Sequence, residues 1–393
     1  MNSRISPIKS VEIELVCETY NTKFVNAMDS NLVSSTATNS IPRDYSLDAA
    51  RGVLMMFGVI IHASDIYSTG EDWLFQDSRT SVAFDTITDI IHVFRMPVFF
   101  WIAGYFCALT ISRYGALGLL RNRAPRLLIP LITTWLSLNV IQALLVANIT
   151  GKTASEAILQ GIPAYHLWFL IDLIIFIFGA TLILPNLKYF HFLTRPIKTI
   201  PALCLFPMLA LFALCISLLA RATDISYESI FGLTSIFRLA TYVPYFIGGI
   251  FMFGRPDIKK NFLRIPAFFV LVTLPLAVFF EGETRGEIFI FGEMAVFAKA
   301  LMVWLSIAAV LRFFQILVTR ESSVTRFLSD AAYTVYLFHH VFVVVVGIAL
   351  LSVEISAWWK FLIVSSTSLI GSALIHAKVI RRYPIAQFLF NGK

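Results

Sequence analysis

The sequence predicts an all-α membrane protein, a bundle of about ten transmembrane helices with both termini on the cytoplasmic side. Of its 393 residues, 58% are hydrophobic and only 14% are charged, roughly half the charged fraction of soluble domains. The mean hydropathy is +0.78. Apolar stretches close to 20 residues long recur over almost the whole chain, and this is the length that an α-helix needs to cross a hydrocarbon core of about 30 Å.

The chain divides into a polar N-terminal tail, residues 1–42, and a membrane domain, residues 43–393. The tail is rich in Ser, Thr and Asn and has no apolar core behind a basic start, so we expect a cytoplasmic tail rather than a cleaved signal peptide. In chain order, the expected spans are residues 49–67, 88–112, 127–147, 166–184, 202–220, 236–253, 265–281, 295–318, 332–351 and 357–376.

The loops between these spans alternate in charge. Because Lys and Arg are enriched in cytoplasmic loops, the basic side is predicted to be cytoplasmic, and the agreement among loops favours an even number of spans. The net charge of +7 therefore reflects membrane topology and not a nucleic-acid-binding surface. The four cysteines lack ligand-like spacing, so neither a metal site nor a disulfide framework is predicted. Basic loops lie at 113–126, 188–198, 255–264, 320–326 and 378–382, acidic ones at 71–89 and 281–293.

The first expected helix carries ionisable side chains at helical spacing. Arg51 and His62 are eleven residues apart, about three turns or roughly 16 Å, so they lie on nearly the same face. Asp48 comes one turn before Arg51 and can pair with it, and Asp65 follows His62 by one turn. An ionisable residue at membrane depth is costly and usually faces a cavity or a partner. The pattern indicates a site on this face, the alternative being a packed, hydrogen-bonded histidine.

A second basic cluster begins the third expected span. Arg123 and Arg126 are about one helical turn apart, so both guanidinium groups can face one anion. Such groups match phosphate oxygens with two parallel hydrogen bonds. On spacing alone, an ordinary basic cytoplasmic loop explains the pair as well or better.

These residues resemble motifs of the membrane acyltransferase-3 family. Arg51 and His62 are similar to the first-helix motif of that family, and Arg123 and Arg126 to its Arg-x-x-Arg pair. The resemblance covers residues 43–393, with one departure at Ala103, where the family often has Ser. Further stretches that resemble the family are residues 45–48, 62–67, 94–104, 166–170, 242–246, 336–340 and 383–393.

The resemblance implies an enzyme of the bacterial inner membrane that moves an acyl group, which we expect to be succinyl, from cytoplasmic acyl-CoA to hydroxyls of periplasmic glucans. Acyl-CoA is then a donor substrate, and no permanently bound cofactor is expected. Arg123 and Arg126 would hold the CoA phosphates, with Arg51 where the pantetheine arm enters. His62, accompanied by Asp65, would be the general base, since its ordinary pKa lies near neutrality. A covalent acyl-histidine stays open.

Five further residues are weaker candidates. His339 is expected to line the acyl-CoA tunnel, whereas the adjacent His340 is expected to point elsewhere. His166 and Trp168 in the fourth span would serve the acceptor side, the alternative being a pair in an aromatic belt. His92 and Arg95 in the second span would also serve the acceptor side, the alternative being a structural role. Asp48 is expected to support the site. Beyond the donor and the glucan, the lipid bilayer is the expected partner, and no binding of nucleic acid is expected. The oligomeric state stays open, and a homo-oligomer is one of the possibilities.

Two other functions fit part of the pattern. One is an O-acetyltransferase acting on lipopolysaccharide or another surface polysaccharide. The other is a secondary transporter, in which paired internal repeats with broken helices are common. A five-plus-five repeat would pair the first span with the sixth, where Gly248 and Gly249 suit a break, but the sixth span has no counterpart of Arg51, His62 or Asp65. Hydrolysis of acyl-CoA by the purified protein would separate the enzyme from the transporter.

Overall fold

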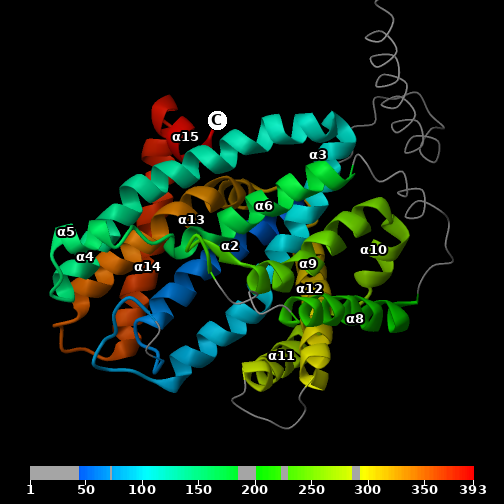
Figure 1. The fold of residues 1–393 in the computed structure, drawn as a ribbon, viewed down its shortest axis with the longest axis horizontal. Coiled ribbons are helices and arrows are strands. Elements are labelled where there is room, and N and C mark those ends of the chain that lie inside the picture. Colours follow the sequence, from blue (N-terminus) through cyan, green and yellow to red (C-terminus); the bar gives the residue numbers. More distant parts are fainter. Residues whose placement is uncertain (1–43, 71–72, 185–200, 223–228, 286–292) are drawn as a thin grey trace, which may run out of the picture. The chain divides into compact units, whose positions relative to one another are not determined.

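The computed structural model describes residues 44–393 except for residues 71–72, 185–200, 223–228 and 286–292. The expected tail, residues 1–42, and the basic loop at 188–198 therefore lie outside the described residues. Within the described part the chain is helical almost throughout (Figure 1). Two strands, β1 (Ser229–Ile230) and β2 (Thr234–Ser235), form a short antiparallel pair with Ser229 opposite Ser235.

The helices follow the apolar stretches of the sequence. The longer ones are α2 (Tyr45–Asp65), α3 (Val82–Thr134), α4 (Val140–Ile149), α6 (Trp168–Ile183), α8 (Ala202–Arg221), α9 (Ile236–Gly254), α11 (Val270–Arg285), α12 (Glu293–Leu317), α13 (Ser323–Leu350) and α14 (Ala357–Ile375). The shorter ones are η1 (Trp135–Asn139), α5 (Ala154–Leu159), η2 (Tyr165–Leu167), α10 (Pro256–Phe262), η4 (Ala267–Phe269), η5 (His376–Ile380) and α15 (Pro384–Asn391).

The number of helices able to span a membrane differs from the expected ten. Among the described residues, eight helices have the required length and hydropathy, or nine if Pro256–Phe262 and Ala267–Glu281, which meet at 62°, form one broken span. Two of the ten expected spans share a single helical run, Val82–Ile149, of 68 residues. If straight, that run would be about 100 Å long, several times the bilayer core. Gly115 interrupts it with a φ of 69°, a conformation that glycine adopts without strain.

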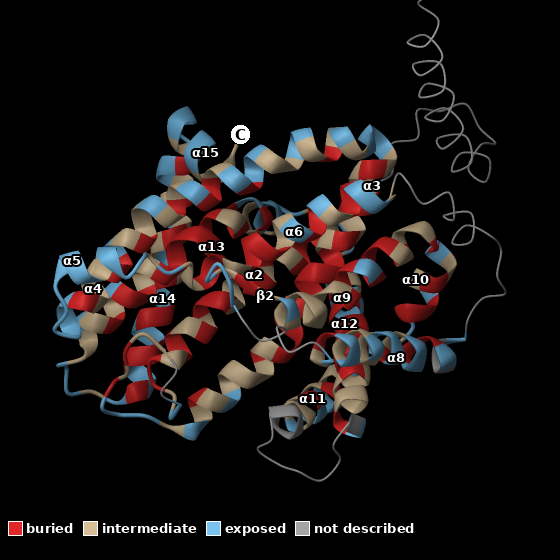
Figure 2. Cartoon of the chain, viewed as in Figure 1, coloured by how far each residue is buried: buried red, intermediate tan, exposed pale blue. Residues whose placement is uncertain are grey.

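The bundle is built around α2, which packs against α13, α3 and α12, while α3 packs closely against α9. Two glycines permit that close approach. A side chain at Gly104 would collide with the carbonyl of Phe246, and one at Gly249 with the carbonyl of Trp101. Figure 2 shows buried residues concentrated on α2, α9 and α13, whereas much of α8 and α15 is exposed. The exposed residues of α8 include large apolar side chains such as Met208 and Leu219, as expected for contact with lipid.

A buried ion pair anchors the segment between α2 and α3. Lys360, near the start of α14, donates to Asp77 Oδ2 at 2.5 Å, and both side chains are at most 2% exposed. The backbone of Asp77 is also held, because its N–H donates to the carbonyl of Ile66 at 2.9 Å. Burial, and secondly the charge of Asp77, raises the pKa of the neighbouring Tyr67 phenol. Asp77, expected as one of several charges of an acidic loop, is thus a buried anchor.

Breaking this pair is expected to destabilise the protein by about 3–5 kcal/mol, because the remaining charge stays buried without a partner. Asp77→Ala and Lys360→Met should each lower the thermal unfolding temperature of the purified protein in detergent. The double variant Asp77→Leu/Lys360→Met removes both charges and should recover much of the loss. A single variant as stable as the wild type would contradict the assignment.

Candidate active site

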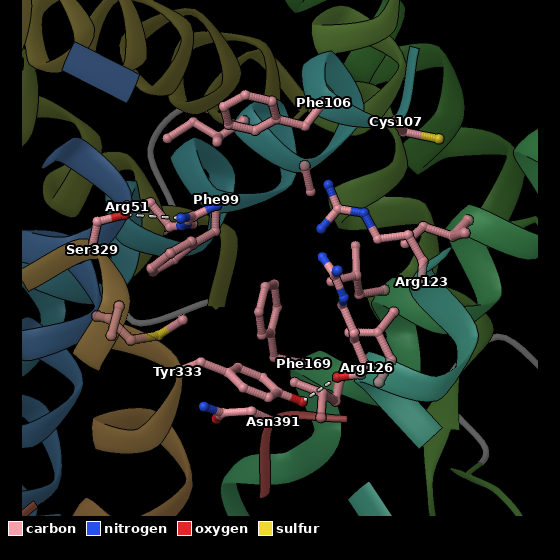
Figure 3. A pocket seen from close by; sticks show the side chains of 18 of the residues that line it. Arg51, Phe99, Phe106, Cys107, Arg123, Arg126, Phe169, Ser329, Tyr333 and Asn391 are labelled. Carbon is pink, nitrogen blue, oxygen red and sulfur yellow. Dashed lines mark hydrogen bonds between the residues drawn. The ribbon is translucent and has the colours of Figure 1, made fainter. Parts of the chain in front are cut away.

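A cavity of about 260 Å³ opens at the basic end of the bundle. Its wall is formed by α2, α3, α6 and α13, and it is completed by Asn391, the last residue of α15, and by Lys393 (Figure 3). Four of the lining side chains are cationic and one, Asp330, is anionic, so the cavity attracts anions. The cationic residues are Arg51, Arg123, Arg126 and Lys393.

The three arginines of the cavity come from two consecutive helices, α2 and α3. Arg51, on α2, donates to Ser329 Oγ at 3.0 Å and lies 3.3 Å from Asp48 Oδ1, which confirms the pairing of Arg51 with Asp48. Arg123 and Arg126, one turn apart on α3, point their guanidinium groups into the same cavity from the opposite side (Figure 3).

The backbone at the arginine pair is held from across the cavity. The Tyr333 hydroxyl on α13 donates to the carbonyl of Arg126 at 3.0 Å. Phe99 and Phe169, whose ring centroids lie 5.6 Å apart, also line the cavity (Figure 3). Phe99 is the lining residue of α3 that is furthest along the chain from Arg123 and Arg126. The cavity is therefore a polar mouth with an aromatic inner end, an arrangement that suits an anionic ligand with a long apolar arm.

A cluster of four histidines lies deeper in the bundle. His62 comes from α2, His166 from η2, and His339 and His340 from α13. The ring of His62 lies 5.4 Å from that of His339 and 4.8 Å from that of His340, measured between centroids. The ring of His166 stacks on His340 at 4.8 Å and contacts His339 at 5.2 Å. We name these four residues the histidine cluster.

His62 is the member of the cluster that is bonded to a carboxylate. Its Nδ1 lies 3.3 Å from Asp65 Oδ2, and the side chains of both residues are 17% exposed. The other oxygen of Asp65 accepts a hydrogen bond from Thr88 Oγ1 at 3.1 Å, which fixes the carboxylate. When Nδ1 carries the proton donated to Asp65, Nε2 is left as the basic nitrogen.

Two of the other histidines, His339 and His340, are oriented by hydrogen bonds from α13 and α4 respectively. His339 Nδ1 donates to the carbonyl of Val335 at 2.9 Å, and its Nε2 is buried without a hydrogen-bond partner among the described residues. His340 Nδ1 is bonded to Gln142 Oε1. The amide of Gln142 donates in turn to Asn139 Oδ1 at 3.2 Å, and Asn139 donates to the carbonyl of Pro163 at 2.9 Å. This series of hydrogen bonds fixes the turn that precedes His166.

The arginine cavity and the histidine cluster are separate in this structure. Met55 is the cavity residue on α2 that lies deepest towards His62, and the two are seven residues apart, about 10 Å along a helix. The two parts of the site lie at different depths along one face of α2, as the spacing of Arg51 and His62 predicts.

A second, smaller cavity of about 110 Å³ lies beside the N-terminal half of α3. It is lined by carboxylate, imidazole, hydroxyl and ammonium groups, which include the ion pair between Lys299 and Glu281. Its lining residues are Asp89, His92, Val93, Pro97, Thr241, Tyr242, Tyr245, Glu281, Lys299 and Val303. His92 thus lines a cavity, while Arg95, one turn further along α3, points to α2 and donates from Nε to the carbonyl of Leu54 at 3.2 Å.

Trp168 is part of a different contact. The guanidinium of Arg238 lies 5.0 Å from the Trp168 ring and donates to Asp172 Oδ2 at 2.9 Å. Trp168 therefore packs in a buried network and is not in the histidine cluster, although its neighbour His166 is.

One sequence expectation about the histidines requires correction. His339, which is expected along the donor tunnel, lies buried beside His62 in the histidine cluster and does not line the arginine cavity, so that expectation stays a prediction. The expectation that His340 points elsewhere is wrong, because its ring contacts both His62 and His166. Gln142 and Thr88, which orient the cluster, were not expected at all; polar side chains within an otherwise apolar span were the available signal.

Comparison with known proteins gives the family. The acyltransferase domain of the acyltransferase-3 family matches residues 44–377. The chain belongs to this family, and it is a membrane O-acyltransferase, which sets aside the transporter. Proteins named glucans biosynthesis protein C from Salmonella paratyphi A and Salmonella agona strain SL483 are each 28% identical over 375 residues, covering 90% of this chain and 95% of theirs. The protein of that name from Salmonella heidelberg strain SL476 is 29% identical over the same coverage. No solved structure matches the chain.

Proposed function

We propose that this acyltransferase moves a succinyl group from cytoplasmic acyl-CoA to a hydroxyl group of a periplasmic glucan, in the inner membrane, with His62 as the general base. The observation that carries the proposal is the His62–Asp65 pair on the same helix face as Arg51, which enters the arginine cavity. The glucan acceptor is supported by the name of the similar proteins, glucans biosynthesis protein C.

The arginine cavity supplies the donor site. Acyl-CoA carries phosphates at one end and a thioester at the end of a long arm, so it needs an anion site at the basic mouth and an apolar path inward. Arg51, Arg123 and Arg126 provide charge-assisted hydrogen-bond donors for the phosphates. The arm then passes the aromatic inner end of the cavity towards His62.

The histidine cluster supplies the chemistry. The glucan hydroxyl attacks the thioester carbonyl carbon, so that a C–O bond forms and the C–S bond breaks. His62 Nε2 takes the hydroxyl proton, and the imidazolium that forms is stabilised by Asp65. The same proton then passes to the departing CoA thiolate, which leaves as a thiol, and the base returns to its neutral state.

The second cavity is the acceptor candidate. Its carboxylates and hydroxyls can exchange hydrogen bonds with sugar hydroxyls, and its tyrosines offer aromatic faces. It lies along the N-terminal half of α3, where its lining residues Asp89 and His92 follow Thr88, whose hydroxyl holds Asp65. A hydroxyl group bound in this cavity would therefore lie near Asp65 along α3.

The test is the charge of the periplasmic glucans in a strain that lacks this protein. We expect mass spectra of extracted glucans to lose the mass of succinyl substituents, and the glucans to become neutral at those positions. Reintroducing the full chain should restore the substituents. Glucans with unaltered substituents, together with loss of acetyl groups from lipopolysaccharide or another surface polysaccharide, would favour the O-acetyltransferase alternative and contradict the proposed acceptor.

A further inference from the structure

Arg95 is a buried cation for which the structure shows no anionic partner. Its side chain is 6% exposed, and it lies between α2 and α3 within the apolar bundle. Among the described residues, no carboxylate lies within 4 Å of it, and the guanidinium makes one hydrogen bond, from Nε to the carbonyl of Leu54. Buried charges in proteins are almost always paired. An anion brought by a ligand would complete this site.

The guanidinium lies beside the histidine cluster. A methyl group added at Gly58 would stand 3.1 Å from Arg95 Cζ and 3.5 Å from His339 Nε2, so both groups border the same point on α2. Gly58 is four residues before His62, which places Arg95 about one turn, or 6 Å, from the imidazole along the same helix face. His339 Nε2 is itself buried and without a partner among the described residues.

Arg95 is also adjacent to the arginine cavity. Its Cζ lies 5.8 Å from the centroid of Phe99, and Phe99 lines the inner end of that cavity. Phe99 therefore borders both the cavity and the guanidinium. A group carried into the bundle on the pantetheine arm passes this point before it reaches His62.

We infer that Arg95 binds the free carboxylate of a dicarboxylic acyl group on the donor and so selects succinyl over uncharged acyl groups; this rests on the proposed function. In a succinyl thioester, three C–C bonds place the carboxylate about 4 Å from the thioester carbonyl. A charge-assisted hydrogen bond of about 2.8 Å from Arg95 then reaches it. The length of the succinyl chain and that of the hydrogen bond together match the distance of one helical turn between Gly58 and His62. The acyl chain is held beside α3, which leaves the thioester open to the glucan.

The test compares succinyl-CoA with butyryl-CoA, which has the same number of carbons but a methyl group in place of the carboxylate. The purified full-length protein in lipid nanodiscs transfers each acyl group to glucan, and kcat/KM is measured for both. Arg95→Gln should lower kcat/KM for succinyl-CoA roughly 10- to 100-fold and that for butyryl-CoA by less than about threefold.

A second variant leaves Arg95 in place. Gly58→Ala crowds the guanidinium and should also reduce succinyl transfer selectively, which keeps the test informative if Arg95→Gln fails to fold. The matched control is Gly179→Ala on α6, where an added methyl group meets no atom within 4 Å; both donors should be unaffected.

Three results would overturn the inference. The first is an equal loss of kcat/KM for both donors in Arg95→Gln, as a purely structural role predicts. The second is unchanged succinyl transfer in that variant, and the third is a wild type that uses both donors equally well. The last result leaves the proposed acyl transfer standing. A wild type that transfers neither group from CoA to glucan would instead contradict the proposed function itself.

Discussion

Replacing His62 with alanine is expected to lower the rate of acyl transfer by about 10³- to 10⁴-fold, which will read as complete loss in most assays. His62 is the histidine of the cluster with a carboxylate on one ring nitrogen, 3.3 Å away, and this leaves the other nitrogen free to take a proton. The measurement is succinyl transfer from succinyl-CoA to glucan by the purified variant, with mass spectrometry of the product.

The matched control is His376→Gln, which changes another buried histidine of the membrane domain. His376 lies on η5 and is bonded to Thr334 Oγ1 at 2.9 Å, outside the histidine cluster. The His376→Gln variant should keep its acyl-transfer activity, which would show that loss of a buried imidazole does not by itself inactivate the protein. Asp65→Asn should reduce the rate less than His62→Ala, because it removes the orienting charge but keeps the base. Normal transfer by His62→Ala would contradict the assignment.

The fold could be predicted from the sequence because the bilayer dictates it. An apolar stretch of about 20 residues has to form a helix, since its backbone groups find no partner in lipid, and each of the ten expected stretches falls in a helical segment. What could not be predicted is how helices join. Gly115 introduces a kink into α3 with one non-helical residue, and the two expected spans on either side of it belong to one helical run. A single glycine in a sequence does not predict whether the helix will kink at that position.

The parts of the site that lie on one helix could also be predicted. Periodicity alone pairs Arg51 with Asp48 and His62 with Asp65, because residues three or four apart are neighbours on a helix. The assembly of the histidine cluster from α2, η2 and α13 depends on tertiary packing, which no spacing encodes. For the same reason, His340 and Gln142, about 200 residues apart in the chain, could not be matched, nor could Lys360 and Asp77.

The arginine pair gives the second large effect. Replacing both Arg123 and Arg126 with alanine is expected to raise KM for succinyl-CoA about 100-fold, roughly tenfold for each arginine, with little change in kcat. Both arginines line the cavity. In the proposed complex they hold the phosphate end of the donor, far from the reacting carbonyl, so they would bind the ground state and the transition state equally. Added salt should weaken donor binding by the wild type more than by the double variant.

Arg121→Ala is the matched control for this pair. Arg121 lies on the same stretch of α3 and is exposed, but it does not line the cavity. The Arg121→Ala variant removes a basic charge from the same end of the bundle. An effect of general surface charge or of membrane topology on KM would therefore appear in this variant too. If the pair holds the phosphates, KM changes in the cavity variants and not in Arg121→Ala. An unchanged KM in the double variant, or an equal rise in the double variant and in Arg121→Ala, would show that these arginines serve topology and not the donor.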